Sequence, residues 1–406
     1  MTIQNYKEQI FSFAFFLMFV LVLFPTNVKS IVIAFFLLIM LAFIITEKLK
    51  FDLKYFIVNA AIYLLLLLSL TYSEDLNFSV KKLESMVSLF VFPLIFSFFS
   101  KQNGYLLIEK LKISNRFLIY YILSVLLINL VFFSIFWFGE FTFLDTTKHY
   151  AYLIDIKLGK YNIHSIYMSM HICVSIIFAL IIIMKNINNK INLFLIIAIL
   201  LQLFFLLVLN KKGPILSLVA ILALYIFYKG NSLKRFIFLA SLVLLTIIIS
   251  TNTKSRDQFK ELFRISDIEE SDVTSTNIRY TIYKNALIAF KKQPFFGYGI
   301  GDSKNELVKV YKNNSLLLYE KEYNTHNQYL SFLLSVGVFG FLLISIAFFY
   351  ILQKGLKQSN FLFLSIFLFY LIEMFSENIL ERENGVIFYS FFVCLFQILK
   401  TEDNTL

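Results

Sequence analysis

Apolar and polar positions along this chain of 406 residues form long oily runs separated by short polar stretches. Runs of about twenty apolar residues, each adding about 1.5 Å of helix, match the ~30 Å hydrocarbon core of a bilayer. The pattern predicts an all-α fold, a polytopic transmembrane helical bundle of about twelve helices. The expected spans lie at about 9–24, 31–46, 55–70, 86–99, 117–138, 164–184, 192–209, 214–228, 236–250, 328–352, 361–379 and 384–399.

One segment breaks this pattern, because it is both long and polar. It divides the chain into residues 1–250 with transmembrane helices 1–9, a large loop at 251–327, and residues 328–406 with helices 10–12. Function often lies in a long, ordered loop of this kind, since merely crossing a bilayer does not need one. We therefore look for the chemistry of the protein in and beside this loop.

The second half of the loop has helical signals of its own. Apolar side chains at 283–290 recur at helical spacing, Ser275 or Thr276 can cap the start, and a Gln-Pro pair ends the run. A second run follows Ser303, which has the form of a capping box with Glu306. We expect two short amphipathic helices that lie on the outer surface of the membrane.

The composition excludes a water-soluble protein. Hydrophobic residues make up 59% of the chain and charged residues 16%, and the mean hydropathy is +0.76, whereas soluble domains carry about a quarter charged residues. The net charge of +11 is spread over short loops between spans, where it meets anionic lipid headgroups, so we expect membrane lipids and no nucleic acid as partners. Cys173 and Cys394 lie in apolar runs and offer neither a disulfide framework nor a zinc site.

The distribution of Lys and Arg over alternate loops indicates the orientation. With the N-terminus inside, the cytoplasmic loops hold more of these residues than the opposite short loops. We therefore expect a multi-pass protein with both termini cytoplasmic, and in a bacterium its membrane is the cytoplasmic (inner) membrane. The 251–327 loop then faces the periplasm, since long loops translocate largely regardless of their charge.

His326 is the first candidate for chemistry. It stands at the start of an apolar run, directly after Asn324 and Thr325, either of which can cap a helix. A helix N-terminus disfavours a cation, so the imidazole should stay neutral, as a general base requires. An interfacial histidine that only hydrogen-bonds water gives the same pattern.

Cations and intramembrane acids supply further candidates. Arg279 has the fork of donors that suits a phosphate, and the Lys211-Lys212 turn opens a helix, which makes an anion site or a pair of membrane anchors. Acids within spans mark functional sites by default. The acids in question are Glu373 and Glu377, four residues apart on one face of a predicted span, and His164 lies at the outer end of another.

Spacing joins several of these residues into a longer pattern. Arg279 precedes a Pro-x-x-Gly-x-Gly turn that starts at Pro294, and the loop ends in His-Asn-x-x-Leu at His326 and Asn327, with Gly-x-x-Gly from Gly337 onward. This pattern resembles the O-antigen ligase and polymerase superfamily, and the resemblance covers nearly the whole chain. The Lys211-Lys212-Gly213 turn stands where that family commonly has Ser-Arg-Gly, which keeps the charge but loses bidentate phosphate geometry.

The resemblance implies an inverting, metal-independent glycosyltransferase of the O-antigen ligase type. It would pass an oligo- or polysaccharide from a polyprenyl-pyrophosphate carrier, such as undecaprenyl pyrophosphate, to lipid A core or another glycan or lipid acceptor, as in lipopolysaccharide biosynthesis. His326 would be the general base, and Arg279, Lys211 and Lys212 would bind the pyrophosphate. Supporting residues would be Glu373, Glu377, His164 and Asn327. No cofactor or metal is expected, since the outer loop has no Asp-x-Asp pair.

Two alternatives remain at the level of the sequence. An O-antigen or exopolysaccharide polymerase would extend the glycan on its lipid carrier with the same parts. A lipid or polysaccharide transporter would also account for the spans, but it would more naturally have internal repeats and broken helices at mid-membrane.

Overall fold

The computed structural model describes residues 3–101, 115–139, 141–158, 161, 163–185, 188–229 and 274–399. The span predicted at 236–250 and the first part of the large loop, up to residue 273, lie outside the described residues. Every regular element within the described ranges is an α-helix or a 3₁₀ turn, which confirms the predicted all-α fold.

The helices follow one another with short connections. Those before residue 230 are α1 (Ile3–Phe19), α2 (Thr26–Thr46), α3 (Leu53–Leu68), α4 (Leu76–Ser85), α5 (Ser88–Phe99), α7 (Asn115–Gly139), α8 (Phe143–Lys157), α9 (Ser165–Met184), α10 (Asn189–Leu209) and α11 (Lys212–Lys229). Those after residue 273 are α14 (Ser275–Lys292), α15 (Ser303–Asn314), α16 (Leu316–Lys321), α17 (Gln328–Lys357), α18 (Phe361–Glu373) and α19 (Glu383–Ile398). The 3₁₀ turns are η1 (Leu21–Leu23), η2 (Ser69–Thr71) and η5 (Ile379–Glu381).

Six of the described helices are long and apolar enough to cross a membrane, and the pair α4 and α5, bent by 47°, makes a seventh if it counts as one span. The six are α2, α3 with η2, α7, α9, α10 and α17. The predicted count of about twelve is therefore not confirmed within the described residues. The apolar parts of α11, α18 and α19 are only 10–17 residues long, and helix length, not composition alone, decides whether a run can span.

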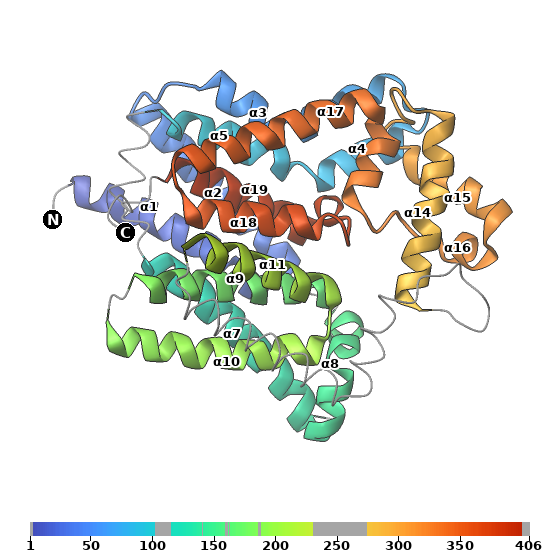
Figure 1. Cartoon of the computed structure of the whole chain (residues 1–406). Helices are drawn as coiled ribbons and strands as arrows, with labels where there is room; N and C mark the ends of the chain where they lie inside the picture. The colour runs from blue at the N-terminus through green and yellow to red at the C-terminus, as the bar shows by residue number, and fades with distance from the viewer. Residues whose placement is uncertain are drawn as a thin grey trace.

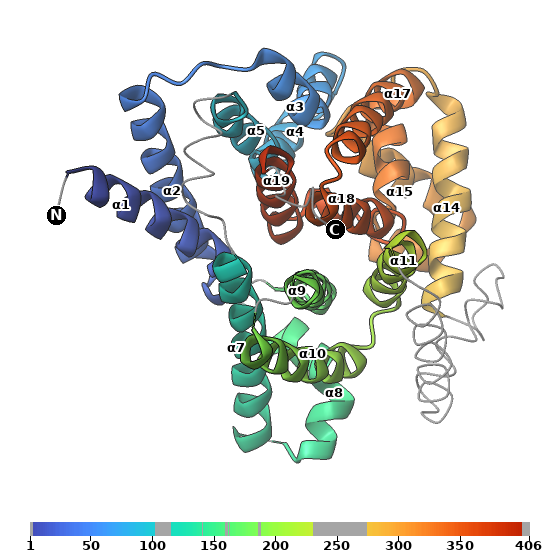
Figure 2. The ribbon, with the colours of Figure 1, turned by 60° about the vertical axis from the view of Figure 1, so that its left-hand side comes forward.

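Two helices, α9 and α19, form the centre of the bundle (Figure 2). Every residue of α19 from Asn384 to Ile398 is buried. The helices α5 and α18 pack against α19, while α7 and α10 pack against α9. A helix that is apolar on all sides is expected at the core of a bundle, because no face of it prefers a polar surrounding.

The helices α14, α15 and α16 lie at one end of the bundle, and the start of α1 and the end of α19 lie toward the other end (Figure 1). Two amphipathic helices were predicted for this part of the chain, and the structure has these three. Thr274 caps α14, in place of the predicted Ser275 or Thr276. The predicted capping box at Ser303 is also wrong, since α15 begins after Asp302 and has no side-chain cap.

Asp302 does not cap its own helix, and its carboxylate instead binds the turn that precedes α4. Its carboxylate accepts hydrogen bonds from the backbone N–H groups of Glu74, at 2.7 Å, and Asp75, at 3.1 Å, where α4 begins. This contact ties α15 to α4 across more than two hundred residues of sequence.

A break in α17 joins this helix to the glycine turn that follows α14. Gly337 has φ +63° and ψ −169°, so the helical hydrogen bonds open there. The freed carbonyls of Leu334 and Ser335 accept from the backbone of Tyr298 and Gly299, at 2.8 and 2.9 Å. A Cβ at Gly337 would collide with the carbonyl of Phe295. The two glycine motifs of the sequence thus interlock, and they fix α14 relative to α17.

Candidate active site

His326 lies in the turn before α17, with its backbone in the left-handed region at φ +42°. The side-chain oxygen of Asn324 accepts a hydrogen bond from the His326 N–H at 3.0 Å. Asn327 caps α17 through two amides of the first turn. The expectation that Asn324 or Thr325 caps this helix is therefore wrong, and the neutral ring of His326 stays a prediction.

His326 is paired with a carboxylate from a distant part of the chain. Its Nδ1 lies 3.2 Å from Oε2 of Glu377. A carboxylate at Nδ1 favours the tautomer that carries its proton there, and this leaves Nε2 as the acceptor. The His326 side chain keeps 25% of its surface exposed, against 11% for Glu377. The pair has the arrangement of a base that is oriented by a buried acid.

Glu377 does not lie on α18. That helix ends at Glu373, so the prediction that Glu373 and Glu377 share one helical face is wrong. Burial raises the pKa of Glu377, but the hydrogen bond with His326 and the charges of His326 and Arg279 outweigh it and hold this pKa below the ordinary value of 4.5. Glu377 is therefore a carboxylate at neutral pH.

The two segments that carry this pair are hydrogen-bonded to each other. The Gln328 N–H donates to the carbonyl of Met374 at 2.8 Å, and its side-chain oxygen accepts from the N–H of Leu380 at 2.9 Å. The Asn327 amide donates to the carbonyl of Phe375 at 3.2 Å. Each segment donates hydrogen bonds to the other, so the turn before α17 and the loop after α18 form one unit.

The helix α14 packs beside this unit. The Tyr283 hydroxyl lies 2.9 Å from the carbonyl of Phe375 and 3.2 Å from that of His326. Arg279 stands one turn earlier on α14, and its charge lowers the pKa of Glu377. The Nε of Arg279 is buried and has no hydrogen-bond partner among the described residues. A buried guanidinium donor without a partner is costly, so this group is suited to meet an anionic ligand.

The Lys211-Lys212-Gly213 turn lies against the end of α18. A Cβ at Gly213 would be 2.5 Å from Oγ of Ser376 and 3.3 Å from Oε2 of Glu373. Only a glycine allows this approach without displacing those groups. Lys212 is the first residue of α11 and Lys211 precedes it. The turn therefore brings two cations beside the loop that follows α18.

His164 caps α9 through Nδ1, and its Nε2 lies 3.5 Å from a carboxylate oxygen of Asp155. Burial and the charges of Lys211 and Arg382 lower the pKa of His164, against the opposing charges of Asp155 and Glu377. Charges act strongly only over short distances, so the N-terminal start of α9 lies near Glu377 and the Lys211-Lys212 turn. The capping bond and the pair with Asp155 make His164 a structural neighbour of the site.

Sequence reasoning did not select four residues that the structure brings to the site. Arg382 is the residue directly before α19 and contributes a further cation. Asn378 and Glu381 lie beside Glu377, and Lys82 of α4 lies 3.6 Å from Glu381. The signal was present as the polar cluster at 376–384 between two apolar runs, but its partners come from distant segments.

No group of three or more His, Cys, Asp or Glu side chains in the described part of the chain is placed to hold a metal ion. Metal independence and the absence of a cofactor stay predictions.

The fold and site define a class of protein: a multi-pass α-helical membrane protein with a polar site at one end of its bundle. Residues 197–345 match the O-antigen ligase family, which confirms the predicted resemblance. The match covers less than half of the chain and supports the O-antigen ligase and polymerase superfamily. It also supports a glycosyltransferase-type enzyme acting on glycan and lipid substrates in the membrane. No curated protein matches the chain.

Proposed function

We propose that this protein transfers a glycan from a polyprenyl-pyrophosphate carrier to an acceptor hydroxyl. The reaction takes place at the outer face of the bacterial cytoplasmic membrane. The observation that carries the proposal is the His326–Glu377 pair, at 3.2 Å, with the unpartnered Nε of Arg279 beside it. A base and an anion-binding group at one place are what this transfer requires.

The pair supplies the base. The acceptor hydroxyl attacks the anomeric carbon of the carrier-linked glycan while its proton moves to Nε2 of His326. The ring becomes a cation during this step, and the carboxylate of Glu377 at Nδ1 stabilises that cation. A single displacement of this kind inverts the anomeric configuration.

The cations supply the stabilisation of the leaving group. As the glycosidic bond to the carrier breaks, negative charge develops on the pyrophosphate. Arg279 and the Lys211-Lys212 turn meet this charge, and the N-terminal ends of α9 and α11 add a positive potential. Arg382 adds another cation at the start of α19.

The arrangement of the ends supports the proposed orientation. The start of α1 and the end of α19 lie toward the end of the bundle opposite α14–α16 (Figure 1). With both termini in the cytoplasm, the site faces the periplasm, where a carrier pyrophosphate at the headgroup level can reach it.

A ligase and a polymerase use the same donor and differ only in the acceptor. The assay therefore offers the purified protein one polyprenyl-pyrophosphate-linked glycan with either lipid A core or a second carrier-linked glycan. A product on lipid A core identifies a ligase, and a lengthened glycan on the carrier identifies a polymerase.

The decisive variant is His326→Ala. Loss of the general base lowers transfer by roughly 10²- to 10⁴-fold, while the amount of protein in the membrane is unchanged. His164→Ala is the matched control, because it removes an imidazole from the same end of the bundle and should cost less. Transfer by His326→Ala at the wild-type rate would show that His326 is not the base.

Two further measurements test the leaving-group side. Arg279→Ala lowers turnover by about 10²-fold or more, the size found for one charge-stabilising donor, whereas Lys212→Arg is tolerated because it keeps the charge. Transfer also continues in EDTA. A loss of activity in EDTA that magnesium or manganese restores would overturn the metal-independent mechanism.

A further inference from the structure

Asn378 contacts Glu377 and the two neighbours of His326 in the chain. Its side-chain oxygen accepts hydrogen bonds from the Thr325 hydroxyl, at 2.9 Å, and from the Asn327 N–H, at 2.7 Å. These two residues flank His326 in the chain. The Asn378 N–H donates to Oε1 of Glu377 at 3.3 Å. One residue thus holds the turn on both sides of His326 and also the carboxylate opposite it.

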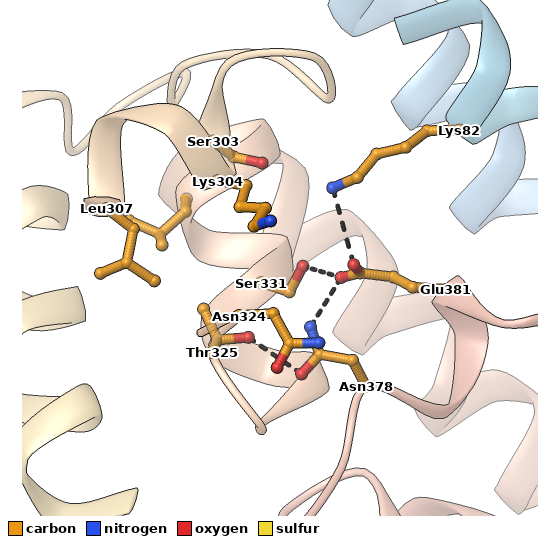
Figure 3. Close-up of a pocket in the computed structure, with 10 residues that line it drawn as sticks. Lys82, Ser303, Lys304, Leu307, Asn324, Thr325, Ser331, Asn378 and Glu381 are labelled. Carbon is orange, nitrogen blue, oxygen red and sulfur yellow. Dashed lines mark hydrogen bonds and ion pairs between the residues drawn. The ribbon is translucent and has the colours of Figure 1, made fainter. Parts of the chain in front are cut away.

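Glu381 fixes the orientation of the Asn378 amide. The Asn378 NH₂ donates to Oε1 of Glu381 at 2.8 Å, and the Ser331 hydroxyl donates to the same oxygen. Lys82 lies 3.6 Å from the other oxygen, as Figure 3 shows. A flipped Asn378 amide would turn its oxygen toward a carboxylate, so only one orientation is favourable.

The polar side chains that line the surrounding pocket in Figure 3 bond to one another or to neighbouring residues. Lys304 pairs with Glu322 at 3.4 Å, and the Ser303 hydroxyl bonds to that of Ser335 at 3.1 Å. None of the residues lining this pocket has a buried side-chain N or O atom without a partner among the described residues. A fully paired polar network rigidifies its surroundings.

The turn at His326 needs such support. Its φ of +42° is uncommon for a residue other than glycine, and such a backbone conformation persists only where the surrounding structure holds it. The bonds from Thr325 and Asn327 to Asn378 hold it from both sides.

We propose that Asn378, oriented by Glu381, is a positioning residue that sets the ring of His326 against Glu377. This inference rests on the proposed function, since it concerns the same pair. It adds a chain of contacts that begins with the ion pair of Lys82 and Glu381 and continues by hydrogen bonds through Asn378 to the residues on both sides of His326.

The test acts on the hydrogen bond between Asn378 and Glu381: one substitution removes its donor, and a second substitution supplies a donor from the other side. Asn378→Asp keeps the acceptor oxygen for Thr325 and Asn327, but it places a carboxylate against Glu381, so kcat falls by about tenfold or more. Glu381→Gln in the same chain restores a donor, and kcat of the double variant returns to within about threefold of Glu381→Gln alone. Asn314→Asp is the matched control, because it makes the same substitution at another hydrogen-bonded amide, where Asn314 of α15 donates to Asn285 of α14.

Kinetics separate positioning from general damage. The KM for the carrier-linked donor stays unchanged in Asn378→Asp, because the cations are untouched. In a Glu377→Gln background the same substitution lowers kcat by less than threefold, since the interaction that it would misalign is already weakened. If Asn378→Asp does not accumulate in membranes, Asn378→Ser carries the same expectations, apart from the rescue by Glu381→Gln.

Parallel measurement of His326→Ala distinguishes the two ways to fail. If His326→Ala is inactive while Asn378→Asp transfers at the wild-type rate, the positioning role is wrong and the proposed function stands. If Asn378→Asp is impaired but Glu381→Gln does not restore it, the orientation by Glu381 is wrong. If His326→Ala is fully active, the proposed function fails and the positioning role fails with it.

Discussion

Glu377→Gln tests the least expected feature of the site, the carboxylate that orients His326. The substitution keeps the shape of the side chain and a hydrogen-bond acceptor within reach of Nδ1, 3.2 Å away in the structure. It removes the negative charge that stabilises the imidazolium when the acceptor proton arrives. The perturbation is therefore electrostatic, and the folded structure should persist.

The magnitude follows from the type of hydrogen bond. Bonds to a charged group contribute about 1.5–3 kcal/mol and neutral bonds about 0.5–1.5 kcal/mol. Both side chains are mostly buried, with 25% and 11% exposed, so water screens the interaction only in part. Glu377→Gln then loses about 1–1.5 kcal/mol, which is roughly a tenfold fall in kcat. Glu377→Ala loses the whole bond and about one to two orders of magnitude.

The assay is transfer from a defined polyprenyl-pyrophosphate-linked glycan by purified protein in lipid vesicles, with kcat and KM measured separately. The KM for the donor should stay constant, because the pyrophosphate is bound by other residues. Equal kcat for wild type, Glu377→Gln and Glu377→Ala would refute the role of the pair, even if His326→Ala were inactive.

Three other properties can be measured without the transfer assay. The pKa of Glu377 is lowered in the folded state, so its ionised form stabilises the fold fully above the ordinary value of 4.5. This contribution is lost as the pH falls through the lowered pKa. The Tm difference between wild type and Glu377→Gln should therefore be larger at pH 7 than at pH 4. Gly337→Ala should destabilise the protein by about 1–3 kcal/mol, because its Cβ meets the Phe295 carbonyl, whereas Gly139→Ala, with nothing within 4 Å, should not; equal Tm values would contradict the interlocked turn. An impermeant maleimide should label Lys312→Cys and not Lys357→Cys in intact cells, with low background because Cys173 and Cys394 are buried; the opposite labelling would reverse the orientation.

The spans illustrate what an apolar pattern predicts well and what it does not. The runs at 31–46 and 192–209 became α2 and α10, each of 21 residues. The run at 361–379 became the 13-residue α18 followed by a polar loop. Hydropathy averages over a window, so it does not register the point at which Glu373 ends a helix and the chain turns back into the site.

The site could be predicted in part, because its members are chemically distinctive. His326 and Arg279 were selected from residue type and spacing, and the structure brings both to Glu377. Asn378 and Glu381 were not selected, since an amide and an acid in a polar loop are ordinary until their partners are known. Those partners include Thr325, 53 residues away in the chain.

The sequence by itself determined that this is a helical membrane protein and where its unusual polar residues stand, because both follow from local composition and periodicity. Only the tertiary structure decided which of these residues meet. The pairing of His326 with Glu377 depends on hydrogen bonds between the turn before α17 and the loop after α18. The place of Arg279 depends on the interlocked backbone at Gly337. Contacts of this kind join segments far apart in the chain, and no local pattern of residues specifies them.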